Sequence, residues 1–477
     1  MNNSISRDLT KEFYPNQRLA AVKRRKKASW LIVFLFILFP VYAQQNSETS
    51  RRDIIQFGTE TEIASLIQSL RTENADYLDD ELIKLVENTR HQRILTGVFG
   101  FFGEREKNGL EGRAMRAISE RDDETNETIL SAIDYLGRIK AAEAVSIIME
   151  LLNTEERRFL SSGFRALGRA SSVNSELADE AAEFLIDFYT YRDAGDDNSR
   201  ELIVAIGATG SSKGVELLAD IATNTDERIT TRMAALGALS QIGDERGLDA
   251  ILSCIGTTDP NVRSSAVAAL GPFSGDAVDA AILDAFRDSF YRSRIAAAQA
   301  SRERKLEAAV PFLRFRAERD DVPAVRDEAI RALGAIAGEE AAGILQNLFS
   351  ERRNSDRVRI VAAEMYMRST SGRNFPQLVV ELEEARTRNQ TNLYNGLLRV
   401  TGETVVEGDK TEIENITRRF LLDGTIIEKL YGLDMALNNS LTGLAEQIIP
   451  LTRERNESIA RRARRTAEGL GIEIPEE

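Results

Sequence analysis

The 477-residue chain has very little of the chemistry on which most enzymes depend, since it contains one cysteine, Cys254, and one histidine, His91. A single cysteine excludes an intrachain disulfide, and the two residues together cannot form a cysteine–histidine zinc cluster. Cys254 lies on the apolar side of ILSCI, which predicts a buried, unreactive thiol, while His91 follows the helical segment LIKLVENTR as a cap or surface residue. We therefore expect no catalytic residue, no metal and no cofactor, and predict that the protein is not an enzyme.

Aromatic residues are also scarce, at 6% of the chain, although 42% of the residues are hydrophobic and 29% are charged. This composition is that of a folded soluble protein whose core is packed by alanine and leucine, which favours helices over a large β-sandwich. The length exceeds that at which a single core keeps growing. The sequence therefore predicts several domains or an array of repeats.

The chain has fewer basic than acidic residues. The chain has 62 Lys+Arg and 76 Asp+Glu, of which eight and two lie in residues 1–43, so the remainder carries 54 basic and 74 acidic side chains. A nucleic-acid partner is excluded on this ground, because neutralising phosphates requires a basic face. Only seven of those 54 basic residues are lysines. The arginine excess predicts fixed ion pairs with carboxylates.

The one long apolar run lies near the N-terminus, where KRRKK (23–27) precedes ASWLIVFLFILF and PVYA. This pattern predicts a secretory signal peptide, residues 1–43, cleaved after Ala43. The alternative is an uncleaved anchor over residues 28–43, although the run is shorter than the roughly 20 residues that span a bilayer. The long polar segment 1–21 suggests a misassigned start near Val22. We expect export to a bacterial periplasm or cell envelope, with membrane contact only through this segment.

The stretch ELIVAIGATGSSKGVELLADI (201–221) has the outline of a phosphate-binding loop, with an apolar run, a glycine-rich turn, a lysine and a helix. A P-loop requires a glycine directly before the lysine and a hydroxyl residue directly after it. Here Ser212 precedes Lys213 and Gly214 follows it, so a nucleotide site is not predicted. The apolar run is interpreted instead as the end of a helix, and Lys213 as an exposed residue in a turn.

Self-comparison shows an eight-residue frame that recurs along the chain, as in RMAALGAL (232–239), RSSAVAAL (263–270) and RDEAIRAL (326–333). These three frames begin with arginine and have alanine three residues later, and other segments fit the frame more loosely. The frames end at residues 136, 167, 206, 239, 270, 301, 333, 366, 398 and 437. Most gaps are 31 to 33 residues, and two gaps of 39 coincide with polar insertions near 191–199 and 402–410. Such a period indicates stacked helix pairs.

The predicted fold is therefore an all-α solenoid, a superhelix of about 11–13 helix-turn-helix repeats. We predict degenerate repeats or a cap over 44–125, a regular array over 126–452, and a C-terminal capping helix and tail over 453–477. LTGVFGFFG (95–103) is expected to be an atypical first helix, with an exposed membrane or partner contact as the alternative. RERNESIARRARR (453–465) is expected to be a solvated cap, with contact to an anionic surface as the alternative.

The pattern resembles HEAT repeats of the short type also found in phycobilisome-lyase-like proteins, over roughly residues 126–470. The D-x-x-V-R and A-L-G elements carry this resemblance, at Asp259, Val262, Arg263, Leu270 and Gly271, and again at Val325, Arg326, Leu333 and Gly334. It implies a non-enzymatic surface for binding another protein. HEAT-like hydroxylases need several histidines for a di-iron centre and HEAT-like DNA glycosylases need a basic face, and this chain has neither.

Two sets of candidate site residues follow from the repeat. The frame arginines are predicted to form a structural ladder with carboxylates of neighbouring units, with ligand binding as the alternative: Arg232, Arg263, Arg294, Arg326 and Arg359. Acidic residues on the second helices are predicted to line the concave face and to bind a basic segment: Glu143, Glu150, Glu216, Asp220, Asp249, Asp279, Glu339 and Glu340.

The function predicted from sequence is a protein-binding scaffold or adaptor of the periplasm or envelope, with an unknown and possibly basic protein partner. One alternative is a lyase-like or chaperone-like protein that handles a small ligand of tetrapyrrole type. Another is a binding arm tethered to the membrane by residues 28–43.

Overall fold

The computed structural model describes residues 49–192 and 196–475. Every regular element within these ranges is a helix, and the helices follow one another as pairs joined by short turns. The all-α solenoid predicted from the sequence is confirmed. The chain divides into two compact units, of which unit 1 ends at residue 151 and unit 2 begins at residue 152.

Unit 1 contains three helix pairs in which the first helices α2, α4 and α6 pack in succession. The segment LTGVFGFFG forms most of α4, and its Val98, Phe99 and Phe102 are completely buried. It is therefore a core helix, as predicted, and the exposed-contact alternative is wrong. Residues 49–57 are also helical, and the labelled α-helices of unit 1 that follow are α2 (Glu60–Glu73), α3 (Asp79–Asn88), α4 (Gln92–Glu104), α5 (Glu111–Ser119), α6 (Asn126–Arg138) and α7 (Val145–Leu152).

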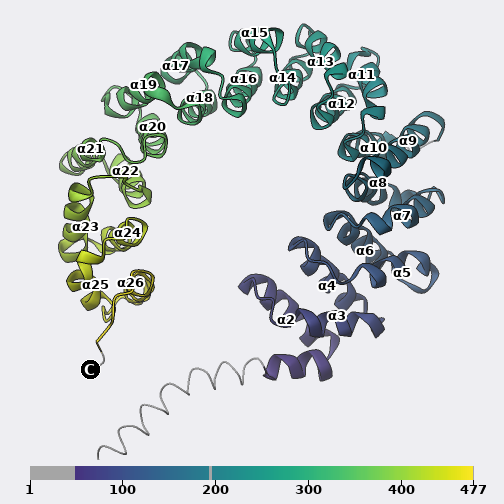
Figure 1. Ribbon diagram of the computed structural model, residues 1–477, viewed down its shortest axis with the longest axis horizontal. Helices are drawn as coiled ribbons and strands as arrows, with labels where there is room; N and C mark the ends of the chain where they lie inside the picture. The colour runs from purple at the N-terminus through teal and green to yellow at the C-terminus, as the bar shows by residue number, and fades with distance from the viewer. Residues whose placement is uncertain (1–48, 193–195, 476–477) are drawn as a thin grey trace, which may run out of the picture. The chain divides into compact units, whose positions relative to one another are not determined.

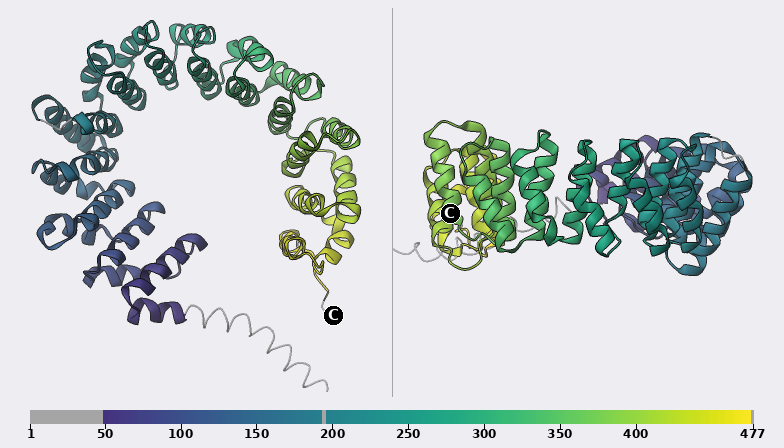
Figure 2. Two further views of the ribbon diagram at one scale, coloured as in Figure 1. Left: turned by 180° about the vertical axis from the view of Figure 1, so that it is seen from behind. Right: turned by 90° about the horizontal axis from the view of Figure 1, so that it is seen from above.

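Unit 2 contains nine helix pairs and a last helix, arranged in two rows (Figure 1). The first helices form the inner row of the curve: α8 (Arg157–Ser171), α10 (Asp196–Thr209), α12 (Ile229–Ile242), α14 (Pro260–Ala269), α16 (Tyr291–Arg304), α18 (Pro323–Ile336), α20 (Asp356–Ser369), α22 (Thr391–Glu403), α24 (Ile426–Asn438) and α26 (Glu457–Gly469). The second helices form the outer row: α9 (Ser175–Tyr191), α11 (Val215–Thr223), α13 (Leu248–Ile255), α15 (Asp276–Ala285), α17 (Val310–Arg319), α19 (Gly338–Ser350), α21 (Phe375–Thr387), α23 (Thr411–Asp423) and α25 (Ala445–Leu451). Figure 2 shows the same two rows from behind and from above.

The aspartate of the D-x-x-V-R element caps the start of a first helix by accepting hydrogen bonds from free backbone N–H groups. Asp259 is the N-cap of α14, and its carboxylate accepts hydrogen bonds from the backbone N–H groups of Asn261 and Val262. Pro260 occupies the first turn, where a missing N–H costs nothing. Val262 then points into the core, where it is completely buried. The element thus starts a first helix and anchors it.

The glycine of the A-L-G element allows first helices to approach each other closely. A Cβ atom on Gly168 of α8 would lie 2.6 Å from the carbonyl oxygen of Ala205 on α10, and one on Gly207 of α10 would lie 2.6 Å from Ala238 on α12. Only glycine fits such contacts between backbones. The first helices pack more tightly along their row than the second helices do. This difference places the first helices on the inside of the curve.

The same glycine contact corrects the predicted frame of α22. A Cβ atom on Gly402 would lie 2.4 Å from the ring of Tyr431 on α24, which makes Gly402 equivalent to Gly168 and Gly207. The frame of this repeat therefore ends at residue 401, three residues later than the predicted 398. The predicted frame TNLYNGLL fitted because small and apolar residues satisfy both registers. With this change, the extra residues of the predicted 39-residue gap are divided between the repeats before and after residue 401.

The second insertion is an ordered segment held by one buried side chain. Asn439 is 1% exposed, and its side-chain oxygen accepts a hydrogen bond from the backbone N–H of Val406 at 2.8 Å. Its amide nitrogen donates to the carbonyl oxygen of Thr404 at 2.9 Å. Residues 404–407 thereby lie against the ends of α20 and α24. The first insertion includes residues 193–195, which are outside the described residues.

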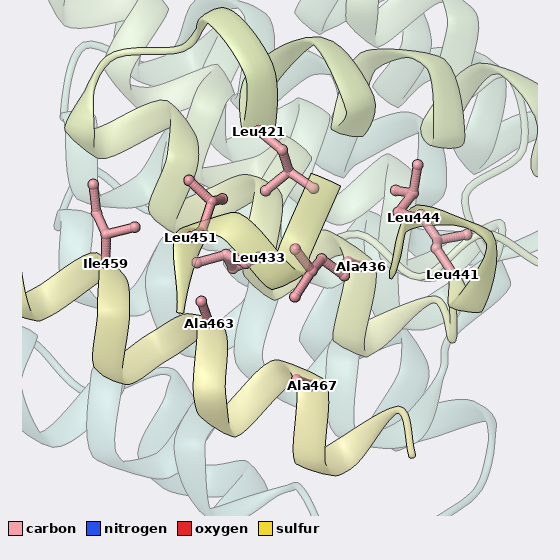
Figure 3. Packing of buried hydrophobic residues seen from close by; sticks show 10 residues of the cluster. Leu421, Leu433, Ala436, Leu441, Leu444, Leu451, Ile459, Ala463 and Ala467 are labelled. Atoms are coloured by element: carbon pink, nitrogen blue, oxygen red, sulfur yellow. The ribbon is translucent and has the colours of Figure 1, made fainter. Parts of the chain in front are cut away.

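The array ends in a compact core formed by α23 to α26 (Figure 3). Ala463 and Ala467 of α26 face Leu433 and Ala436 of α24, and all four are completely buried. Arg461 and Arg465, on the opposite side of α26, are exposed. This helix therefore closes the core with its alanine face and presents arginines outward, as a terminal cap does.

No helix in residues 49–192 or 196–475 is long and apolar enough to cross a membrane. The predicted signal peptide, the Ala43 cleavage point and the alternative anchor 28–43 all lie outside the described residues.

Candidate functional site

The frame arginines bind the ends of the preceding outer helices. Five guanidinium groups donate to backbone carbonyl oxygens there: Arg232 to Ala222, Arg263 to Thr257 and Thr258, Arg294 to Asp288 and Ser289, Arg326 to Asp320, and Arg359 to Phe349. Ala222 and Phe349 lie in the last turn of a helix, where carbonyl groups lack intrahelical partners and carry partial negative charge, so a cation is favoured there. The other acceptors lie directly after the helix or in the turn that follows it.

Three of these arginines also bind a carboxylate, but not one from a neighbouring pair. Arg263 binds Asp288, Arg294 binds Asp320 and Arg359 binds Glu381, and each carboxylate belongs to the second helix of the same pair or directly follows it. The preceding pair contributes backbone carbonyls instead. Each arginine thus links two consecutive pairs, and its polar atoms are used by the protein itself.

Arg294 and Asp320 are the most buried of these ion pairs. Burial by itself raises the pKa of the Asp320 carboxyl, but the hydrogen bonds from Arg294 and from the backbone N–H of Val322 outweigh burial, and the net pKa lies below its usual value. The carboxylate in turn raises the pKa of the Arg294 guanidinium. Both groups are therefore charged at neutral pH and are already paired.

The predicted acidic residues do not lie on the inner face of unit 2. Glu216 and Asp220 are on α11, Asp249 is on α13, Asp279 is on α15, and Glu339 and Glu340 are on α19, which are all outer-row helices. The prediction assumed that second helices line the concave side, whereas the glycine contacts place the first helices there. Two of the acidic residues are also ion-paired, Asp279 with Arg304 and Glu339 with Arg373. In unit 1, Glu143 and Glu150 are exposed residues of the third helix pair.

The two rows of unit 2 differ in charge. The inner-row helices contain 22 arginine and lysine residues against 13 acidic residues, whereas the outer-row helices contain 6 basic and 21 acidic residues. The outer helices α9, α11, α13 and α15 have no lysine or arginine at all. The inner side is therefore the less acidic side, the reverse of the sequence prediction.

A groove of about 520 Å³, with Arg200 as its one charged lining residue, lies over the inner-row helices α10, α12 and α14. Its floor is the exposed side of α12, where Thr230, Met233, Ala234, Gly237 and Gln241 follow one another at helical spacing. A Cβ atom on Gly237 would meet nothing within 4 Å, so the groove is open above it. Small and apolar side chains with no charge are unusual on the surface of a chain that is 29% charged.

One wall of the groove is formed by α10, through Val204 and Arg200. Val204 is 37% exposed although the residues on both sides of it are core residues. Sequence analysis missed this groove because Ala, Gly and Met on α12 were interpreted as packing positions. The signal that could have revealed it is that α12 is apolar on all sides, which leaves one apolar side exposed.

The other residues singled out in the sequence lie in the core, at a helix start or in a turn. Cys254 is buried, and its thiol donates to the carbonyl oxygen of Ala222, which also accepts from Arg232. His91 is an exposed N-cap residue of α4. Lys213 is exposed in the turn before α11 and pairs with Glu183. No group of histidine, cysteine and carboxylate side chains able to hold a metal occurs in the described part of the chain.

A family model described as spirochaete HEAT repeat protein matches residues 55–466. The chain belongs to this family. The match extends the HEAT array through the region of degenerate repeats that sequence analysis placed at 44–125. No curated protein matches this HEAT repeat protein significantly.

Solved structures match this HEAT repeat protein at low sequence identity. A mutant of Kap121p is 11% identical, with a TM-score of 0.45 over 88% of this chain and 53% of that chain. The Escherichia coli YibA protein is 15% identical, with a TM-score of 0.36 over 55% of this chain and 96% of its own. Human deoxyhypusine hydroxylase is 19% identical, with a TM-score of 0.23 over 57% and 97%. This chain spans about half the length of Kap121p.

Proposed function

We propose that this HEAT repeat protein is a non-enzymatic scaffold or adaptor that binds another protein along the inner row of unit 2. The observation that carries the proposal is the groove over α10, α12 and α14, whose floor on α12 has no charged side chain. Exposed apolar surface beside polar surroundings is typical of sites where proteins associate. The groove extends across three repeats, which suits a segment of a protein chain lying across successive first helices.

The electrostatics of the groove support this choice of surface. The frame arginines of the inner row form hydrogen bonds within the protein, so we do not expect them to bind a ligand. The exposed side of α12 carries no charge that a partner would have to desolvate, and desolvating unpaired charges is costly. A basic partner, which the sequence predicted, is better suited to the acidic outer helices than to this groove.

We also propose that the protein is exported and acts in the periplasm or cell envelope. The positive segment 23–27, the apolar run and the small residue Ala43 support this. Sequencing the N-terminus of the protein isolated from its cells tests it. A terminus at Gln44 supports export with cleavage, retention of residues 28–43 supports the membrane-tethered arm, and a cytoplasmic protein contradicts both.

The binding surface is tested by a photo-crosslinking amino acid placed at Gly237, where open space admits a large side chain. The matched control carries the same amino acid at Ser253, an exposed position on the outer helix α13. We expect irradiation of intact cells to produce a specific adduct with one protein from position 237 and not from 253. Equal adducts from both positions, or none from 237, would contradict the inner row as the binding surface.

A tetrapyrrole-type ligand is the alternative function, and it has no structural observation in its favour. Absorbance and mass spectrometry of the protein purified under native conditions test it directly. A bound chromophore in stoichiometric amount would replace the scaffold proposal.

A further inference from the structure

Two exposed arginines of α8, the inner-row helix next to α10, have no carboxylate partner among the described side chains. Arg165 and Arg169 are exposed on α8, a helix that contains four arginines and no acidic residue. Arg165 donates a hydrogen bond to the Ser162 hydroxyl at 3.3 Å. Neither arginine has a carboxylate within ion-pair distance among the described side chains.

These arginines and the groove lie on adjacent helices in matching positions. Gly168 of α8 contacts Ala205 of α10, and Gly207 of α10 contacts Ala238 of α12. Arg165 and Val204 each precede their contacting glycine by three residues, and Gly237 takes the corresponding place on α12. Since residues at the same position of successive first helices lie side by side, Arg165, Val204 and Gly237 form a line across the inner row.

The charge along this line changes in one direction. It begins at α8 with Arg165 and Arg169 and continues at α10 with Arg200, whose guanidinium is 3.5 Å from its neighbour Glu201. It then reaches the uncharged side of α12, and Ser265 of α14 borders the far side. The surface is therefore cationic at one end and apolar at the other.

From this arrangement we infer that the partner binds through an extended segment that has acidic side chains close to a short apolar stretch. The acidic side chains would meet Arg165, Arg169 and Arg200, and the apolar ones would enter the groove above Gly237. Arg165 and Arg169 have no carboxylate partner of their own in the described part of the chain, so they favour carboxylates over lysine or arginine side chains. This inference rests on the proposed function and adds the chemical class of the partner.

The spacing of the helices defines the segment further. Neighbouring packed helices are about 8–10 Å apart, and an extended chain advances about 3.3 Å per residue. The distance from Arg200 on α10 to the groove on α12 is one helix spacing, and that from Arg165 on α8 is two. In the extended partner segment, the acidic residues should therefore be about three to six residues from the apolar stretch.

The test is a selection of random 12-residue peptides displayed on phage against the full chain, immobilised through a C-terminal tag. Enriched peptides are synthesised, and their affinities are measured by fluorescence anisotropy. We expect enriched sequences with two or more Asp or Glu residues about three to six positions from Leu, Val or Ile. Enrichment of basic or uncharged peptides, or of none, overturns the inference.

Two double variants locate the binding site of the selected peptides. Arg165→Glu with Arg169→Glu is expected to weaken binding by at least about tenfold. Arg461→Glu with Arg465→Glu makes the same charge change on the exposed side of α26 and is expected to change it by less than about twofold. Equal losses in both variants overturn the inference, and circular dichroism confirms that both variants are folded.

A third variant, Gly237→Trp, fills the groove and leaves the arginines in place, so it is expected to abolish binding of the same peptides. Unchanged binding places the peptides elsewhere and overturns the inference. Failure of the scaffold proposal is distinguishable, because that proposal depends on the adduct from position 237 in cells. If such an adduct forms with a segment that is not acidic, the scaffold proposal is supported and the inference of an acidic partner segment is overturned.

Discussion

Arg294 on α16 and Asp320 after α17 form a two-point ion pair that is almost completely removed from solvent. The Nε–Oδ2 distance is 2.7 Å and the Nη2–Oδ1 distance is 2.8 Å, and the side chains are 8% and 0% exposed. Arg294 also binds two carbonyl oxygens of the turn between α15 and α16. One side chain therefore joins two consecutive helix pairs.

Replacing this arginine should destabilise the array locally. Arg294→Ala removes the two-point partner of the buried Asp320 carboxylate and leaves Arg316, at 3.3 Å, as its remaining cation, so we expect a loss of up to about 3–5 kcal/mol. Urea denaturation gives the total loss, and hydrogen exchange should show it concentrated in α14 to α18, because repeats contact only their neighbours. Arg314→Ala is the control, since the exposed pair Arg314–Glu318 is worth less than about 1 kcal/mol. Similar losses in both variants would contradict the structural role of Arg294.

The same ion pair predicts a pH dependence. Because the folded-state pKa of Asp320 lies below its usual value of 3.8, its contribution to stability is present above that value and is lost as the pH falls through the folded-state pKa. In Arg294→Ala, burial remains and the pKa of Asp320 should rise. The stability difference between wild type and Arg294→Ala is therefore expected to be largest near pH 7 and to shrink below about pH 4. A difference that stays constant to pH 3 would be inconsistent with this linkage.

Two glycines of the inner row should respond to alanine in opposite directions. Gly207 faces Ala238 with no room for a Cβ atom, so Gly207→Ala forces α10 and α12 apart at a cost of about 1–3 kcal/mol. Gly237 has open space, so Gly237→Ala should stabilise α12 by about 0.5–1 kcal/mol through helix propensity. Thermal denaturation of both variants measures the contrast. A loss at Gly237 equal to that at Gly207 would mean that the groove is not open.

The side chain of Asn439 is expected to hold the insertion at 404–407 in place. Asn439→Ala removes the acceptor for the Val406 N–H and the donor to Thr404, which costs about 1–3 kcal/mol. Hydrogen exchange should increase at residues 404–407 and leave α12 unchanged. Asn438→Ala is the control, because Asn438 is exposed and makes a longer bond of 3.3 Å to the Gly402 carbonyl. No change in exchange at Val406 would argue against this role of Asn439.

The repeat could be predicted because every helix pair uses the same kinds of frame, cap and turn residues. Arg-x-x-Ala frames, N-caps such as Asp259 and turns such as GATGSSK depend on neighbours within one or two helices, so their spacing appears directly in the sequence. The frame of α22 was misplaced by three residues because TNLYNGLL and the later frame are both apolar. The contact between Gly402 and Tyr431 distinguishes them, and it joins residues from different repeats.

The sequence by itself determined the helical class and the period of the array, since hydrophobic periodicity and capping act over short distances. Only the tertiary structure decided which row faces inward. That choice depends on how closely Gly168 and Gly207 let neighbouring first helices pack, compared with the wider spacing of the second helices. It moved Glu216, Asp220 and Asp249 to the outer side and exposed the uncharged side of α12 on the inner one. A sum of small differences between packed surfaces sets curvature, and no single repeat contains that information.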